Sequence, residues 1–185
     1  MTILAGDHAK VFVDGYELTA DSNRITVNDS VATYDVTAFN DQVHKFIRGS
    51  HIVTLDHVGY MEAAAARSHP VLKDVSVSGV VSTVLGLNAA PAVGNPMYSL
   101  LTQQSKYSTL PRIGSYIPFA ALFANRGDLG GWGNALAVAE TFTNTKNGTG
   151  IDGGAQTTNG GAAFLHVLQA AASDTYSIII EGSTA

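Results

Sequence analysis

The N-terminal third of the chain alternates apolar and polar residues from Val11 to Met61. A period of two is typical of β-strands that bury one face. Turn-forming residues interrupt the pattern, and one such pair, Asp14-Gly15, lies between Val11–Val13 and Tyr16–Leu18. Because Asp-Gly tolerates the positive φ angles of a tight two-residue turn, the pattern predicts a β-hairpin at this point.

Two further strands are predicted in this stretch, each with one apolar and one small polar face. Side chains two residues apart share a face of a strand. In the first strand, Ile25, Val27 and Val31 share one face with Asp29, and the other face carries Thr26, Asn28 and Ser30. In the second, His51 to Tyr60, the faces carry Val53 and Leu55 on one side and Thr54 and Asp56 on the other. Between the two, the chain from Tyr34 to Phe46 predicts a long loop or one helical turn.

Patterns farther along the chain predict more strands and two short helices. The alanine-rich segment Met61–Arg67 favours a helix that ends before Pro70, and Pro96 favours a second helix, with Met97, Leu100 and Leu101 as its apolar face. Asn125–Asn134 predicts a glycine-rich turn. The remaining predicted strands are 74–85, in which Ser76, Ser78 and Ser82 alternate with valines, and then 113–124, 135–143, 162–169 and 175–181.

These elements predict a mainly β fold, a β-sandwich or partly closed barrel with one or two short helices. The length of 185 residues fits a single domain, 1–185. Residues 1–10 have no pattern and predict an N-terminal arm, which a neighbouring subunit could order. Residues 145–161 are rich in glycine and predict a long exposed loop.

Composition favours an assembled protein over a free monomer. Charged residues make up 14% of the chain, against about 25% in ordinary proteins, so a monomer would show water an unusually uncharged surface. A surface covered by neighbouring subunits accounts for this, and a compact β domain with a bland surface is the alternative. The net charge of −5 leaves no basic footprint for gripping nucleic acid. The longest mostly apolar window, Tyr116–Ala124, is too short to span a bilayer, and the N-terminus lacks the pattern of a signal peptide, so we expect a soluble protein without membrane association.

No constellation of residues predicts catalysis or a cofactor. His44, His51 and His57 occur with Asp41 and Asp56, but His51 and His57 are six residues apart on one predicted strand, about 20 Å, too far for one tetrahedral metal ion. Ser50, Asp56 and His57 lack the nucleophile elbow and oxyanion loop of a hydrolase. The glycines after Asn147 lack the Lys-Ser/Thr pair of a phosphate loop. We therefore expect no enzyme, no cofactor and no metal site.

Four short motifs, in order, resemble the N-terminal part of the major tail tube proteins of long-tailed bacteriophages. That family has an apolar-Asp-Gly-Tyr hairpin, then Asp-Val-Thr-aromatic, then a Gly-led strand ending in Leu-x-x-x-Gly. The corresponding residues here are Val13-Asp14-Gly15-Tyr16, Asp35-Val36-Thr37-Ala38-Phe39, Phe46-Ile47-Arg48-Gly49 and Leu55-Asp56-His57-Val58-Gly59. The resemblance covers about a third of the chain.

The resemblance implies a structural virion protein made in the cytoplasm of a bacterial host. It implies rings of six subunits whose inner strands join into one continuous barrel, with rings stacked head to tail as a conduit for DNA. The partners would be further copies of the chain and other phage tail proteins, with DNA as transient cargo. In the family, the loop corresponding to Asn40–Gly49 reaches an adjacent subunit, which implies interface roles for Asn40, Asp41, Phe46, Ile47 and Arg48.

A conduit should repel phosphate, so small polar or acidic strand faces are the candidates for its wall. These faces carry Thr26, Asn28, Ser30, Thr54, Asp56, Ser76 and Ser78. An alternative for Asp56 is pairing with Lys45 or Arg48 on the outer surface. The alternative function is a binding module, either a phage decoration protein or a β-sandwich adhesin that grips a glycan with Thr145–Gly161 and Trp132.

Overall fold

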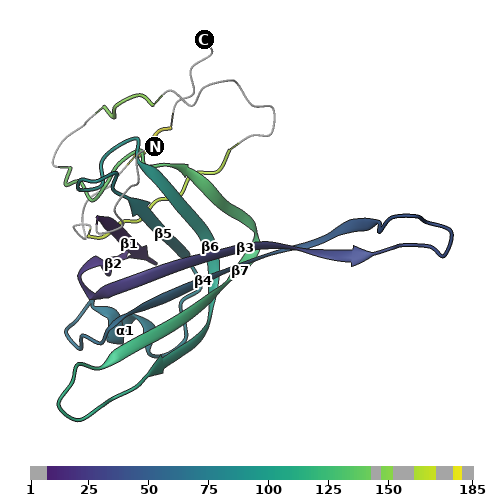
Figure 1. Ribbon diagram of the computed structural model, residues 1–185. Helices are drawn as coiled ribbons and strands as arrows, with labels where there is room; N and C mark the ends of the chain where they lie inside the picture. Colours follow the sequence, from purple (N-terminus) through teal and green to yellow (C-terminus); the bar gives the residue numbers. More distant parts are fainter. Residues whose placement is uncertain (1–7, 143–146, 152–160, 170–176, 181–185) are drawn as a thin grey trace.

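The computed structural model describes residues 8–142, 147–151, 161–169 and 177–180. It is mainly β, as predicted, with one short α-helix in the described residues (Figure 1). The elements in chain order are β1 (Ala9–Val13), β2 (Tyr16–Glu17), the 3-10 helix η1 (Thr19–Asp21), β3 (Ser22–Asp35), β4 (Phe46–Tyr60), α1 (Ser68–Leu72), β5 (Val80–Leu85), β6 (Pro96–Thr109) and β7 (Pro118–Asn134).

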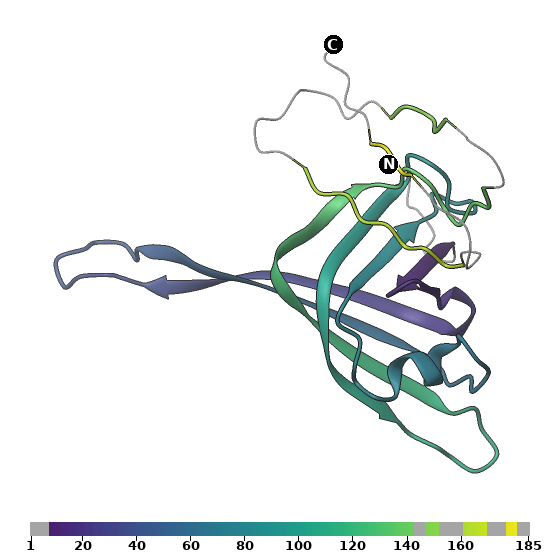
Figure 2. The same ribbon diagram turned by 180° about the vertical axis from the view of Figure 1, so that it is seen from behind.

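All seven strands form one antiparallel sheet in the order β2-β1-β5-β6-β7-β4-β3. The sheet curls, so that strands near its opposite ends pack on the same core. Val11 and Val13 of β1 belong to one buried cluster with Leu55 of β4, and Ile25 of β3 packs against it. The two edge strands are not joined to each other, so the single curled sheet corresponds to the partly closed barrel and not to the two sheets of a sandwich (Figure 2).

The predicted N-terminal hairpin is confirmed. Val13 pairs with Tyr16 across the turn, and Asp14 and Gly15 have φ angles of 46° and 82°. Two consecutive positive φ angles are the requirement of a tight hairpin turn whose twist matches the strands. The strand that enters this turn, β1, begins at Ala9, so the last residues of the predicted N-terminal arm belong to the sheet, and residues 1–7 lie outside the described part of the chain.

Both predicted helices are wrong. Residues 61–67 form turns, and α1 begins only at Ser68, with Pro70 in its first turn, where the missing N–H is not needed. In this segment the Glu62 carboxylate accepts hydrogen bonds from the backbone N–H of Ala63 and of Ala64. Pro96 begins the central strand β6 instead of a helix. There, pairing on both sides outweighs local propensity.

The predicted glycine-rich turn Asn125–Asn134 is also wrong, because β7 continues through it. Gly130 faces Leu100 of β6 so closely that a Cβ would lie 2.4 Å from the Leu100 side chain and 2.9 Å from the carbonyl oxygen of Ser99. The glycine thus permits close approach of two strands. No strand occurs at residues 135–142, 162–169 or 177–180, so these predictions fail wherever the structure describes them.

The predicted strand 74–85 is half right. Only β5, from Val80, has regular pairing, yet the carbonyls of Val77 and Gly79 still accept hydrogen bonds from Gln104 and Thr102 of β6. Ser76 and Ser78 therefore lie in an irregular segment between α1 and β5, and not on a strand face as predicted.

Gly59 of β4 allows the 3-10 turn η1 to pack against the sheet. A Cβ at this position would lie 2.0 Å from the backbone oxygen of Asp21 and 2.8 Å from the ring of Phe119. We expect Gly59→Ala to lower the free energy of unfolding by ~1–3 kcal/mol, because backbone and ring must move. Denaturant titration measures this. Gly133→Ala in β7 is the control, since no atom lies within 4 Å of its added Cβ, and an equal effect of both changes would contradict the packing argument.

Candidate assembly interface

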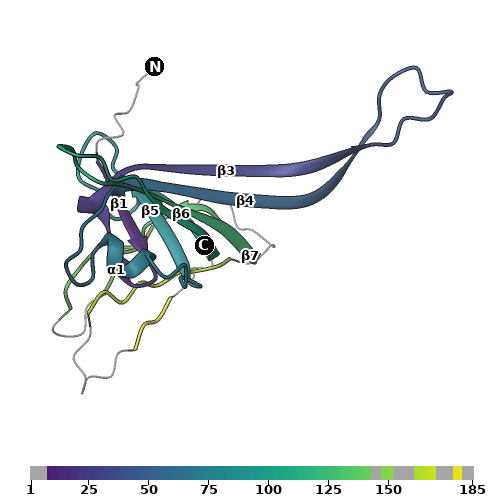
Figure 3. The ribbon, with the colours of Figure 1, turned by 90° about the horizontal axis from the view of Figure 1, so that it is seen from below.

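A two-stranded arm projects from the body of the protein (Figure 1, Figure 3). Strand β4 pairs with β7 only from Thr54 to Tyr60, whereas it pairs with β3 as far as Phe46. Beyond Val53 the hairpin of β3 and β4 therefore has no third strand among the described residues. We call residues 29–53 the arm. Each of its strands runs roughly 20 Å past the sheet at the usual rise per residue.

The loop at the tip of the arm, residues 36–45, is held by its own hydrogen bonds. The Asp35 carboxylate accepts from the backbone N–H of Thr37 at 2.9 Å and from its hydroxyl, and Nδ1 of His44 lies 3.0 Å away. The Asp41 carboxylate pairs with Lys45 and accepts from the N–H of Ala38. The hydrogen bond from the Thr37 side chain is the main cause that lowers the pKa of Asp35 below its usual value. The hydrogen bond from Lys45 is the main cause that lowers the pKa of Asp41.

The arm exposes large apolar side chains. Phe39 and Val43 in the tip loop and Phe46 and Ile47 at the start of β4 are all exposed, and Phe39 is fully exposed. Arrays of this kind on one projecting element are typical of surfaces that another molecule covers. The predicted interface residues are thus brought together, Asn40 and Asp41 in the tip loop and Phe46, Ile47 and Arg48 beside it. However, residues 46–49 were predicted to belong to the loop, and in the structure they form the start of strand β4.

Four of the predicted lumen residues form one polar patch on the sheet face opposite the core. Thr26 pairs with Asp56 and Asn28 with Thr54 across β3 and β4. The Asn28 amide donates to the Asp56 carboxylate at 3.2 Å and lies 3.5 Å from the Thr54 hydroxyl. Their strand neighbours Val27, Val53 and Leu55 face the core.

The three other residues predicted to face the lumen are Ser30, Ser76 and Ser78. Ser30 continues the same face at the base of the arm, where its hydroxyl donates to the carbonyl of Ile52. Ser76 and Ser78 are not on β3 or β4, and the Ser78 hydroxyl instead accepts from Arg126 at 2.6 Å. Lys45, which could have paired with Asp56, pairs with Asp41 at the arm tip.

Sequence reasoning missed two cations on the polar face. Arg24 of β3 and Lys106 of β6 line one groove with Asp56 and Ser108. Arg24 follows the outward alternation of Thr26 and Asn28 and lies opposite Val58, so the strand pattern could have revealed it. Lys106 could not be found this way, because β6 was predicted to be a helix and has a bulge between Gln104 and Lys106.

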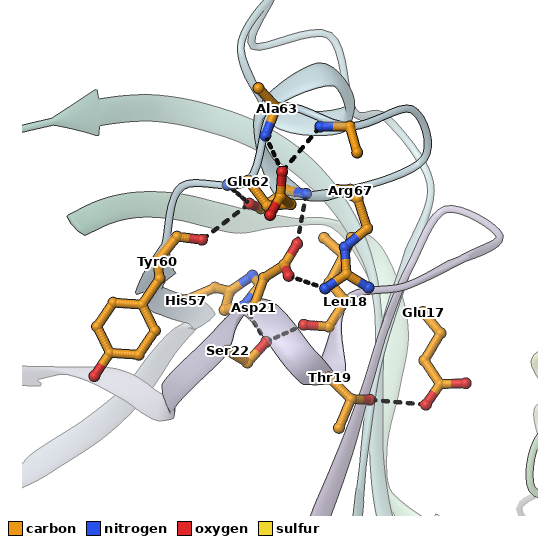
Figure 4. Close-up of polar contacts among 12 residues, drawn as sticks. Glu17, Leu18, Thr19, Asp21, Ser22, His57, Tyr60, Glu62, Ala63 and Arg67 are labelled. Carbon is orange, nitrogen blue, oxygen red and sulfur yellow. Dashed lines mark hydrogen bonds and ion pairs between the residues drawn. The ribbon is translucent and has the colours of Figure 1, made fainter. Parts of the chain in front are cut away.

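A buried polar cluster joins the start of β3 and the end of β4, which lie at the end of this hairpin remote from the arm, to the rest of the fold (Figure 4). We call it the root cluster; it consists of Asp21, Ser22, His57, Arg67 and Ser68. The Asp21 carboxylate is buried and accepts from the Arg67 guanidinium and from the N–H of Ser68 at 2.8 Å. The Ser68 hydroxyl donates to the carbonyl of Tyr60 at 3.1 Å. The cluster thereby connects η1, the start of β3, the end of β4 and α1.

His57 contributes a neutral imidazole to this cluster. The Ser22 hydroxyl donates to the carbonyl of Leu18 at 2.7 Å, so it must accept from Nε2–H of His57, also at 2.7 Å. Nδ1 of His57 then keeps a lone pair without a hydrogen-bond partner among the described residues. Burial lowers the pKa of His57 from its usual 6.5 to about 4, against a smaller opposing effect of Asp21.

The geometry separates the residues considered for catalysis or metal binding. His57 points into the core while Asp56 points outward, and His51 pairs with Asp29 on the arm. Among the described residues, no three His, Asp or Glu side chains are grouped as metal ligands. Trp132, considered for glycan binding, is exposed and packs edge-on against Tyr98; of the loop 145–161, the structure describes only 147–151 and 161.

Solved structures of tail assemblies have the same fold. This chain matches a chain in the virion of a native gene transfer agent particle, with a TM-score of 0.53 and 12% identity, over 71% of this chain and 99% of that chain. It matches the tail of an empty gene transfer agent particle with C6 symmetry, with a TM-score of 0.50 and 12% identity, over 72% and 99%. It also matches the terminating cap of the anti-feeding prophage tube, with a TM-score of 0.52 and 7% identity, over 73% and 93%.

No protein-family model and no curated protein sequence matches the chain. The structural matches show that the fold is the tail-tube-like fold of phage structural proteins, as the resemblance in the N-terminal third predicted. Among the described residues, no helix is long and apolar enough to cross a membrane.

The root cluster makes stability depend on pH through His57. Its pKa is about 4 in the folded protein and near 6.5 when unfolded, so the unfolded state binds more protons as the pH falls through this range. We expect the free energy of unfolding to fall by up to ~3 kcal/mol between pH 6.5 and 4 from this residue. His57→Gln keeps a donor for Ser22 but cannot titrate, so urea titrations of this variant should show a shallower pH dependence.

The control for this experiment is His44→Gln, which removes an exposed imidazole at the arm tip. That variant should keep the pH dependence of the unmodified protein. The same slope in His57→Gln as in the unmodified protein would contradict the role of His57.

Proposed function

We propose that the chain is a tail tube subunit that assembles into the six-membered rings implied by the resemblance to tail tube proteins, and that stacked rings form a conduit for DNA. The observation that carries the proposal is the arm, which exposes Phe39, Val43, Phe46 and Ile47 on a two-stranded projection. Isolated two-stranded hairpins are marginal in water. An arm of this kind gains its stability when a second copy covers it.

The open edge of β3 supports assembly as well. This strand is 14 residues long and pairs with β4 on one side only among the described strands. An exposed strand edge presents unpaired backbone N–H and C=O groups, and closing strands into a barrel removes such edges. A ring whose sheets join from subunit to subunit would remove the edge of β3 in this way.

The polar patch of β3 and β4 supplies the wall of the proposed conduit. Thr26, Asn28, Ser30, Thr54 and Asp56 would face the lumen, and Arg24 and Lys106 border the same surface. The core face of these strands is unavailable, since it is buried. Asp56 offsets one of these two cations, so with the small polar groups it limits how tightly such a wall would hold phosphate.

The structures that share the fold belong to the virion and tail of a gene transfer agent and to a prophage tube cap. In agreement with those assemblies, we propose a structural, non-enzymatic role in a virion tail, after synthesis in the host cytoplasm, with other tail proteins as partners. Electron microscopy of the purified protein tests the proposal. Rings or tubes are expected, and a monodisperse monomer at high concentration would contradict it.

The arm should contribute more to assembly than to folding. Phe46 and Ile47 are exposed on β4, so Phe46→Ser with Ile47→Ser removes contact area in the assembly without opening the core. We expect loss of rings in electron microscopy with a change in unfolding free energy of ~0.5 kcal/mol or less. Ile178→Ser with Ile180→Ser, also exposed but outside the arm, should assemble normally. Joint loss of fold and rings, or normal rings, would show that the arm residues have another role.

Asp56 should limit how strongly the proposed wall retains DNA. Together with Arg24 and Lys106 it gives the groove a formal charge of +1, from two cations and one carboxylate, and Asp56→Lys makes this +3. Rings should still form, but the tubes should retain DNA, more strongly at low salt where screening is weakest. Co-sedimentation of DNA with tubes measures this, with the exposed Asp74→Lys as control. Unchanged DNA retention and full infectivity of Asp56→Lys particles would remove Asp56 from the lumen.

A further inference from the structure

A second apolar surface lies on the loop between β6 and β7, residues 110–117. Its side chains Leu110, Ile113 and Tyr116 are exposed, and Ile113 has no protection from its own chain. The Tyr116 ring packs edge-on against Tyr60 at 4.7 Å, which fixes one side of the loop. A mainly apolar groove lies at its base, lined by Val58, Leu110, Pro118, Phe119 and Ala120 together with Ser108 and Thr109.

This loop and the arm tip lie at opposite ends of the same strand. Tyr60, the last residue of β4, pairs with Pro118 beside the loop, whereas Phe46, the first, borders the arm tip. The 15 residues of β4 span roughly 45 Å at the usual rise. Figure 1 shows the arm and the loop between β6 and β7 on opposite sides of the body. Within one copy, neither apolar surface can cover the other.

Charge also matches between the two ends. Loop 110–117 carries Arg112 and no acidic residue, and within the described residues Arg112 has no ion-pair partner. The arm tip carries Asp35 and Asp41, and hydrogen bonds lower the pKa of both. Asp41 already pairs with Lys45, which leaves Asp35 as the acidic group for a partner. The Asp35 side chain is still 46% exposed, so it can accept a further partner.

We propose that loop 110–117 is the receiving site for the arm tip of a second copy. Phe39 of one copy packs beside Ile113 and Tyr116 of the next, with Arg112 near Asp35. The contact joins two different surfaces, so each copy still offers one free arm and one free loop. Such a head-to-tail contact propagates into a ring or a filament and not a closed dimer. The inference rests on the proposed function and identifies the surface that the arm contacts.

Disulfide cross-linking tests this contact without background, because the chain contains no cysteine. Phe39→Cys and Ile113→Cys are made as separate proteins of different tagged size, mixed during assembly and oxidised. A bond forms only where the two Cβ atoms come within about 4.5 Å. We expect mixed dimers of Phe39→Cys with Ile113→Cys, and a ladder of higher oligomers from the double variant. Leu87→Cys, at another exposed leucine, replaces Ile113→Cys as the control and should give no mixed dimer.

A charge variant tests the polar part of the contact. Arg112→Glu in the Ile113→Cys protein should reduce the yield of mixed dimer by about two- to fivefold at low salt, the range for an exposed ion pair. High salt should remove the difference, because it screens the pair.

Electron microscopy of the same samples separates the two proposals. Tubes without mixed dimers, or with dimers of Phe39→Cys alone, would overturn the receiving site while leaving the tail tube function standing. Monomers without mixed dimers would overturn both. Mixed dimers as abundant with Leu87→Cys as with Ile113→Cys would show random collision and would also overturn the receiving site.

Discussion

Burial of the Asp21 carboxylate constrains the end of the β3–β4 hairpin that is anchored in the body of the protein. A charge removed from water requires a counter-charge and hydrogen-bond donors, and their absence costs several kcal/mol. The Arg67 guanidinium and the N–H of Ser68 supply them, and both belong to the segment that follows β4. Because Asp21 immediately precedes β3, this requirement fixes the start of β3 against the end of β4.

The two strands of the arm lack the sheet pairing and core packing that stabilise the body of the protein. Beyond Val53 the described residues offer no third strand, so the tip relies on the contacts of Asp35 and Asp41 for its order. Those contacts use polar groups and leave Phe39 and Phe46 in water. A free monomer gains nothing from this exposure, whereas an assembly gains buried apolar area from a loop that is already ordered. Because the loop is ordered before binding, assembly loses less conformational entropy.

Local patterns predicted the parts of the fold whose causes are local. The Asp14-Gly15 turn and the two faces of β3 and β4 depend on residues close in sequence, and each was found. Phe46 and Ile47 were singled out through the resemblance to tail tube proteins, and the structure leaves both side chains exposed. The helix predicted after Pro96 failed for the opposite reason. Leu100 and Thr102 have neighbours in β5 and β7 that no window of sequence contains.

The root cluster could not be predicted at all, since Asp21 and Arg67 are 46 residues apart and His57 has its role only through Ser22. The arm tip and loop 110–117 are farther apart still, with 65 residues from Lys45 to Leu110, and neither pattern nor composition relates these two surfaces. Their relation follows from β4, which places them at its two ends. A rigid strand with unlike apolar surfaces at its ends favours growth in one direction, and the low content of charged residues, 14%, leaves little repulsion to oppose it. Sheet geometry and composition therefore favour the same outcome, a polymer of identical subunits, for independent physical reasons.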